Sequence, residues 1–565
     1  MSGVGGRLRS IFIALITISA FSFLMWRLYW LQVEKHDFFL GKAKKQHHIS
    51  QKVFPHRGKI LDRNGRDLAI SVPVQSIYGV PGEVDDIDET VQVLSELLNL
   101  KPQRIRERLL RKKHFVWIKR KVSEAASNKI KELKLSGIHL LEEIKREYPG
   151  GELLCHLLGF VNIDNEGLEG LELTFNKQLR GKPGWRKSER DATGREIPFL
   201  RIEDVPANDG SDIVLTIDMA IQTIAETELN EAVISRNAIG GSVIVLDPGS
   251  GEVLAMANMP KYNTNKPTSV PQSHRRNRAV TDMFEPGSTF KPISISIALN
   301  ENIINLNDRF YCENGAFRYA GHTLHDSHSN KVLTVKEIIE QSSNIGAAKI
   351  GLKMGRERFF AGIKGFGCGE KTGIQLPGEI RGVIREPSKW SKLSIICLPM
   401  GQEISVTALQ LICAYGALAN GGILYKPYVI DKIRGDKGNV IWEAHPQRVR
   451  RVISENASSE ITKAMKGVVS LHGTASRAII TGYSVAGKTG TAQKVAIEGG
   501  YSHELYVSSF IGYFPADNPR LVIAVVLDEP KPDYYGGVVA APVFKSIAKK
   551  ILHYLEIPPD IDVSE

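Results

Sequence analysis

The chain has 565 residues, of which 42% are hydrophobic and 24% are charged. These values exclude a disordered or fibrous protein and allow two or more globular domains. The formal net charge of +11 does not indicate a nucleic-acid partner, because the Lys and Arg residues are scattered and the basic run 104–113 accompanies no nucleic-acid-binding motif. We therefore expect no nucleic acid among the partners.

The N-terminus predicts a membrane anchor. Arg7 and Arg9 precede a largely apolar stretch, residues 11–33, whose only charge is Arg27. A helix of this length crosses a bilayer, and the basic flank predicts that residues 1–10 stay in the cytoplasm and that everything after the anchor lies outside. The alternative is a signal peptide cleaved near Ala20-Phe21-Ser22. We favour the uncleaved anchor because the apolar run continues past that site.

The rest of the chain divides near a cluster of turn-forming residues at 206–210. Residues 34–208 are charged and mixed, with helical patterns at 90–100 and 123–133, and predict a spacer or docking module. Residues 209–556 predict a larger domain that ends in a tail, 557–565.

The larger domain has strand patterns at both ends and helical patterns between them. A helix at 219–232 leads into a hairpin of strands at 242–246 and 252–257. A second hairpin, spanning 506–527, precedes a helix at about 542–555. This layout predicts an α/β domain with one antiparallel sheet built from both of its ends.

Three short motifs in this domain carry the chemistry. They are Ser288-Thr289-Phe290-Lys291, Ser342-Ser343-Asn344 and Lys488-Thr489-Gly490-Thr491. None is specific alone, since similar triplets or quartets occur at 546–549, 454–456 and 371–373. Context separates them: a Glu-Pro-Gly turn and an apolar helical pattern flank Ser288, whereas 371–373 lies among loop-forming glycines.

The first motif predicts a nucleophile and its base. At the start of a helix, Ser288 would lie near the positive end of the helix dipole, and the spacing of three places Lys291 on the same face. A serine hydroxyl needs a base, and a lysine can serve if burial or a neighbouring cation keeps it neutral. Lys488 is a candidate for that cation.

The third motif predicts an edge strand that binds substrate. Gly490 would allow a substrate backbone to approach, and Lys488, Thr489 and Thr491 can hold a carboxylate. The backbone N–H groups of Ser288 and Thr491 are candidates for an oxyanion hole.

The three motifs resemble those of the penicillin-binding transpeptidase and serine β-lactamase superfamily. Segments 57–65, 146–151 and 166–172 look like the conserved boxes of class B penicillin-binding proteins. Within that class, 71–74 and 534–544 resemble the cell-division, penicillin-binding protein 3 type. The resemblance covers nearly the whole chain.

The resemblance implies a transmembrane helix, then a mixed α+β, dimerisation-like pedestal, and then a penicillin-binding/serine β-lactamase-like transpeptidase domain. The last domain would have an antiparallel sheet flanked by helices and an all-helical subdomain. It implies a peptidoglycan D,D-transpeptidase that needs no cofactor. Ser288 would be acylated with release of D-alanine, and Lys291 would be the base. Ser342 would relay a proton, and Asn344 would bind the substrate amide. Lys488, Thr489 and Thr491 would recognise the terminal carboxylate, and Gly490 would let the substrate backbone approach.

The implied partners are peptidoglycan stem peptides, lipid-linked precursor strands and β-lactams. A polytopic shape-and-division-class glycosyltransferase and other divisome membrane proteins would be neighbours in the inner membrane, at the septum. The sequence leaves open whether the acyl acceptor is a diaminopimelate or a lysine stem. It also leaves open the oligomeric state and the residues that contact partners.

Several alternatives remain beside this interpretation. The same motifs occur in elongation-type class B enzymes, in β-lactamases and in receptors for β-lactams or wall fragments. A bifunctional class A enzyme lacks support because no glycosyltransferase box follows the anchor. His322, His325 and His328, with Asp326 and Cys312 nearby, could suggest zinc, but their spacing matches no closed zinc motif, and we expect no metal. Arg57, Asp62, Arg63 and Gly65 are interpreted as a salt-bridged clasp or a docking element.

Overall fold

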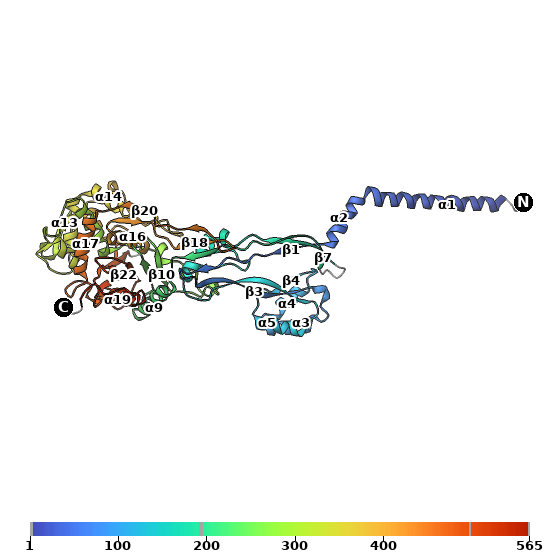
Figure 1. Ribbon diagram of the computed structural model, residues 1–565, viewed down its shortest axis with the longest axis horizontal. Helices are drawn as coiled ribbons and strands as arrows, with labels where there is room; N and C mark the ends of the chain where they lie inside the picture. Colours follow the sequence, from blue (N-terminus) through green and yellow to red (C-terminus); the bar gives the residue numbers. More distant parts are fainter. Residues whose placement is uncertain (1–3, 191–195, 496–498, 563–565) are drawn as a thin grey trace. The chain divides into compact units, whose positions relative to one another are not determined.

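The computed structural model describes residues 4–190, 196–495 and 499–562 (Figure 1). The expected tails 1–10 and 557–565 include residues 1–3 and 563–565, which lie outside the described residues. The chain forms two compact units: Met1–Pro55 with Gly181–Asp209, and His56–Arg180 with Gly210–Glu565.

The first unit contains the apolar N-terminal helix and a small sheet. Helix α1 (Val4–Tyr29) continues as a π-helical turn, η1 (Trp30–Glu34), and is followed by α2 (His36–His47). Strands β1 (His48–Val53), β6 (Gly184–Arg190) and β7 (Glu196–Val205) form an antiparallel sheet in that order. Within the described residues, Gly6–Glu34 is the one helix long and apolar enough to cross a membrane, with a mean hydropathy of 2.0. This confirms the predicted apolar helix.

The second unit contains a seven-stranded sheet in the order β19-β18-β8-β2-β3-β4, with β5 also paired to β3. Its strands are β2 (Ile60–Leu61), β3 (Asp67–Gly79), β4 (Val116–Lys119), β5 (Ile138–Glu147), β8 (Asp212–Leu215), β18 (Ile430–Arg434) and β19 (Val440–Glu443). Segments far apart in sequence therefore share one sheet, and β8 pairs in parallel with β2.

Three helices pack beside β3 and β4 around a separate small core (Figure 1). They are α3 (Ile87–Leu98), α4 (Pro102–Leu109) and α5 (Glu124–Leu133). The sequence predicted α3 and α5. Helix α3 starts before its predicted first residue because the Asp86 carboxylate accepts hydrogen bonds from the N–H groups of Asp88 and Glu89.

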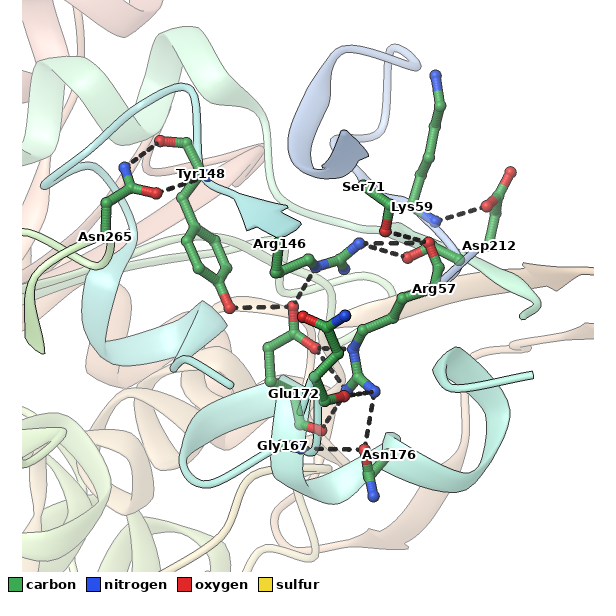
Figure 2. Close-up of polar contacts among 12 residues, drawn as sticks. Arg57, Lys59, Ser71, Arg146, Tyr148, Gly167, Glu172, Asn176, Asp212 and Asn265 are labelled. Carbon is green, nitrogen blue, oxygen red and sulfur yellow. Dashed lines mark hydrogen bonds and ion pairs between the residues drawn. The ribbon is translucent and has the colours of Figure 1, made fainter. Parts of the chain in front are cut away.

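A buried ion cluster joins three distant segments of this unit (Figure 2). The Glu172 carboxylate accepts a hydrogen bond of 2.6 Å from Arg57 and one of 2.7 Å from Arg146, and all three side chains are almost inaccessible to solvent. The Tyr148 hydroxyl also donates to Glu172. Burial lowers the pKa of Arg57, and the attraction of Glu172 opposes that shift.

Of the residues interpreted as a clasp, Arg57 thus lies in the buried cluster. Asp62 instead fixes its own turn, where its carboxylate accepts from the N–H groups of Asn64 and Arg66. Gly65 occupies that turn with a φ of 82°, which favours glycine. Arg63 pairs with Glu252 at 3.4 Å. The residues of this box therefore stabilise the fold locally and between segments.

The central sheet of the larger domain has five antiparallel strands in the order β10-β9-β23-β22-β21. They are β9 (Gly240–Leu246), β10 (Val253–Met259), β21 (Ala486–Val495), β22 (Tyr501–Phe514) and β23 (Leu521–Asp528). Both predicted hairpins are present, and the sheet closes from both ends of the domain as expected. Strand β21 is the edge strand that the third motif predicted.

Helices cover both faces of this sheet (Figure 1). Helices α9 (Met219–Ser235) and α19 (Ala541–Tyr554) pack together on one side, and α16 (Ala408–Ala419) and α17 (Glu455–Val468) pack on the other. Strands β9 and β10 are consequently buried along their whole length. Helices α9 and α19 confirm the patterns at 219–232 and 542–555.

The helical middle of the domain carries the second motif. It contains α11 (Lys291–Asn300), α12 (Val335–Glu340), α13 (Asn344–Met354) and α14 (Arg356–Gly365). Two short ladders accompany them, β12 (Arg309–Tyr311) with β15 (Val332–Thr334) and β13 (Ala316–Tyr319) with β14 (His322–His325). Helix α11 packs against α13, α14 and α17, and it begins at Lys291.

Candidate active site

The three motifs meet at a cleft of about 650 Å³. Its lining includes Ser288, Ser342, Asn344, Thr489 and Thr491, which the sequence predicted as site residues. Lys291 and Lys488 lie beside these residues, and both side chains are fully buried. The structure therefore brings the predicted residues together from segments that are far apart in the sequence.

Ser288 lies in a tight turn at the start of α11. The sequence predicted the first turn of a helix, and the structure has a 3-10 turn, η5 (Gly287–Phe290), before α11 begins. The reason is Pro292, which has no N–H to donate to the Ser288 carbonyl in an α-helical bond. The Lys291 N–H donates to that carbonyl instead. The turn leaves Ser288 partly exposed at the cleft.

Lys291 connects the first motif to the second. Its ammonium group donates to the Ser342 carbonyl oxygen at 2.5 Å, to Ser342 Oγ at 3.2 Å and to Asn344 Oδ1 at 2.8 Å. Burial lowers the pKa of Lys291 to about 7, and the Asp326 carboxylate opposes that shift. A fraction of Lys291 is therefore neutral near pH 7, as a general base requires.

Lys488, the candidate cation, is also fully buried. Burial, followed by repulsion from Lys291, lowers the pKa of Lys488 well below its usual range. Burial is the largest cause of the lowered pKa of Lys291, and it keeps Lys291 partly neutral. Lys488 Nζ makes only long contacts with Thr489, of 3.4 Å to Oγ1 and 3.5 Å to the carbonyl oxygen.

Strand β21 distributes its side chains on two faces, because successive residues of a strand alternate. A Cβ on Gly490 would lie 2.8 Å from Thr289 Cγ2 and 3.0 Å from the Pro286 carbonyl oxygen. The glycine thus allows the nucleophile turn to pack against the strand. On the opposite face, Thr491 Oγ1 accepts a hydrogen bond from the N–H of Gly536, at the start of α18 (Gly536–Val539).

The second motif is held in an unusual backbone conformation. Ser342 has a φ of 60°, which is rare for a residue other than glycine, and this conformation directs its carbonyl and hydroxyl oxygens to Lys291. Asn344 donates its side-chain amide to the His325 carbonyl oxygen at 3.0 Å. The amide oxygen of Asn344 consequently faces Lys291.

A histidine-rich hairpin lies next to this motif. Among the residues that the structure describes, no group of three or more His, Cys, Asp or Glu side chains is placed to hold a metal ion. Asp326 instead accepts hydrogen bonds from Ser343, Asn344 and Ile345. From the sequence alone, Asp326 is a candidate only as a metal ligand.

Sequence reasoning also missed an aromatic wall of the cleft. Tyr506 and Tyr534 stack with ring centroids 4.0 Å apart, and Tyr535 lies against Tyr534 at 4.7 Å. All three line the cleft. The signal was present as two adjacent tyrosines before two glycines, but their distance of more than forty residues from the third motif hides the contact.

The similar segments elsewhere in the chain, at 546–549, 454–456 and 371–373, have structural roles. Ser546 belongs to α19, and Ser454 caps α17 by accepting from the Ala457 N–H. Thr372 and Gly373 bind Glu379 in a loop. None of these residues lines the cleft.

Comparison with known proteins decides the family. Residues 241–549 match the penicillin binding protein transpeptidase domain, and residues 52–215 match the penicillin-binding protein dimerisation domain. The chain belongs to the class B penicillin-binding proteins.

This class B penicillin-binding protein has relatives along nearly its whole length. It is 36% identical to the peptidoglycan D,D-transpeptidase FtsI of Escherichia coli K12, over 96% of this chain and 91% of that protein. It is 35% identical to stage V sporulation protein D of Bacillus subtilis 168, over 99% and 88%. Penicillin binding protein 3 of Mycobacterium tuberculosis, solved with aztreonam, has a TM-score of 0.72 at 28% identity, over 91% of this chain and 99% of that chain.

Proposed function

We propose that this class B penicillin-binding protein is a serine peptidoglycan D,D-transpeptidase that cross-links stem peptides in septal wall synthesis and that β-lactams acylate. One observation carries the proposal. Ser288 lies at the cleft in the turn before a fully buried Lys291, whose hydrogen bonds reach both Ser342 and Asn344. Two of the three motifs thus form one polar network.

Acylation uses this network in two steps. Ser288 Oγ attacks the carbonyl carbon of the penultimate D-alanine, and its proton passes to the neutral amine of Lys291. The bond to the terminal D-alanine then breaks, and the departing nitrogen takes a proton from Ser342 Oγ, which Lys291 replenishes across 3.2 Å. The products are free D-alanine and an ester on Ser288.

Transfer reverses the proton path. The amine of a second stem peptide attacks the ester carbonyl and gives its excess proton to Lys291. Ser288 Oγ leaves, regains a proton and is ready for the next cycle. A β-lactam enters the first half in the same way, but its ring stays attached after opening and blocks the acceptor.

Strand β21 positions the donor peptide. Thr489 and Thr491 line the cleft and, with Lys488, bind the terminal carboxylate, while Asn344 binds the substrate amide. Gly490 keeps the strand close to the nucleophile turn. The backbone N–H groups of Ser288 and Thr491 form the oxyanion hole.

The septal assignment is supported by the resemblance of segments 71–74 and 534–544 to the cell-division type. In this assignment, residues 11–33 anchor the chain in the inner membrane, with residues 1–10 in the cytoplasm and the catalytic domain in the periplasm. Residues 34–208 are the pedestal and 209–556 the transpeptidase domain. The membrane partners are a polytopic shape-and-division-class glycosyltransferase and other divisome proteins. Depletion in the source bacterium should give filaments, whereas rounding would indicate an elongation enzyme.

Intact-protein mass spectrometry tests the reaction. The full chain in detergent is incubated with a penicillin and followed over time, in wild type and in Ser288→Ala. A lasting adduct that digestion maps to Ser288, absent from the variant, is expected. Rapid turnover of the drug would indicate a β-lactamase, and the absence of any adduct would favour a non-catalytic receptor.

A further inference from the structure

Asp326 lies at the end of β14, beside the second motif. Its backbone N–H donates to the Gly315 carbonyl oxygen at 3.1 Å, which ties it to the neighbouring strand of the hairpin. One carboxylate oxygen accepts from the Ser343 hydroxyl at 2.6 Å, and the other accepts from the N–H groups of Asn344 at 2.5 Å and Ile345 at 3.0 Å. The carboxylate thus binds three donors of the motif and of the first turn of α13.

These contacts exceed what a helix cap needs. Ser343 already caps α13, because its Oγ accepts from the Gly346 N–H at 2.9 Å. The additional carboxylate fixes the backbone of Asn344, while the adjacent His325 carbonyl fixes the Asn344 side-chain NH₂. Together, residues 325 and 326 determine which end of the Asn344 amide faces Lys291.

Asp326 is also the anion that acts on Lys291. Among the residues that the structure describes, its field opposes the burial that lowers the pKa of Lys291. The other titratable groups near it are Cys312, whose Sγ lies 3.7 Å from Ser343 Oγ, and Lys349 of α13, which pairs with Glu313 at 2.6 Å. His322, His325 and His328 of its own hairpin are exposed.

We propose that Asp326 is a positioning residue of the transpeptidase reaction, whose carboxylate orients Asn344 toward Lys291 and supplies a negative charge that acts on this working base. The inference rests on the proposed function. It assigns to the histidine-rich hairpin a part in catalysis that acts through the second motif and requires no metal.

Two variants separate charge from shape. Asp326→Asn keeps an oxygen that can accept from the helix N–H groups, since asparagine is itself a favoured cap, but it removes the charge. Asp326→Glu keeps the charge and displaces it. Asp86→Asn is the matched control, because Asp86 caps α3 in the same way, through Asp88 and Glu89, in the separate core of the pedestal.

The measurement is the rate of Ser288 acylation by a fluorescent penicillin, from pH 5.5 to 9, on the full chain in detergent. In wild type and Asp86→Asn, the rate should rise with a midpoint near the Lys291 pKa of about 7. Without the opposing anion Lys291 deprotonates more easily, so Asp326→Asn should move the midpoint down by about one pH unit, and the misplaced amide should lower the plateau about tenfold. Asp326→Glu should keep the wild-type midpoint.

The outcomes are distinguishable. A lower plateau with an unmoved midpoint in Asp326→Asn would reduce Asp326 to a structural cap and overturn the inference, as would an unchanged profile. A midpoint that moves in Asp326→Glu as far as in Asp326→Asn would overturn the inference too, because Asp326→Glu keeps the charge. If Asp326→Asn does not fold, a midpoint that moves down by about one pH unit in Asp326→Glu would likewise overturn it. If wild type itself is not acylated on Ser288, the proposed function fails first.

Discussion

Lys291 Nζ lies 2.8 Å from Asn344 Oδ1, so an ammonium group and an amide from two different motifs hold each other beside the nucleophile. Because Lys291 is the only base proposed for Ser288, Lys291→Ala should lower the rate of penicillin acylation by about 10²–10⁴-fold. Lys549→Ala, in the similar quartet on α19, should react like wild type. A loss of less than tenfold in Lys291→Ala would contradict its role as the base.

Lys488 should reduce stability at neutral pH. At pH values between the lowered pKa of Lys488 in the folded protein and its ordinary pKa near 10.5, the unfolded chain holds one more proton than the folded chain. The stability of wild type should therefore rise with pH through that window. Lys488→Met removes this cost and should stabilise the protein by about 1–2 kcal/mol at pH 7, with the difference shrinking toward pH 10, while acylation slows. Thermal unfolding at both pH values checks the sign, with exposed Lys463→Met as the control.

The buried cluster makes a different prediction for Glu172→Gln. That change leaves Arg57 and Arg146 buried side by side without their shared carboxylate. We expect a loss of about 3–5 kcal/mol in the free energy of unfolding. Glu455→Gln breaks an exposed pair with Arg451, and should change stability by about 0.5 kcal/mol or less. Equal effects of the two changes, measured by denaturant titration, would argue against the cluster as a stabilising clasp.

Gly490→Ala tests the fit between β21 and the nucleophile turn. The added methyl group would press on Thr289 and the Pro286 carbonyl, which are parts of a well-packed turn. Acylation should slow by at least about tenfold, since misplacement of reacting groups is costly. Gly365→Ala places a methyl group in open space at the end of α14, and should leave the rate unchanged. The two acylation rates, measured side by side, settle this point.

Features of the site that depend on residues close together in the chain were predicted from the sequence, whereas contacts between distant segments were not. The spacing of Ser288 and Lys291 and the extended pattern before Lys488 both follow from local periodicity, and the structure has both features. Glu172 was not recognised as the partner of Arg57, and Asp326 not as the partner of the second motif. Both contacts depend on hairpins and turns whose packing no local pattern specifies. The 3-10 turn at Ser288 was predictable from Pro292 but was read as a regular helix.

Both faces of β21 are occupied at Gly490, by the nucleophile turn on one side and by α18 on the other, and only the edge of the strand is open. A ligand that pairs with β21 must then lie within the plane of the sheet, as a single extended chain. A loose peptide tail meets that requirement, whereas the surface of a folded protein is too thick to enter. The same packing that places the nucleophile should thus spare neighbouring folded proteins from acyl transfer.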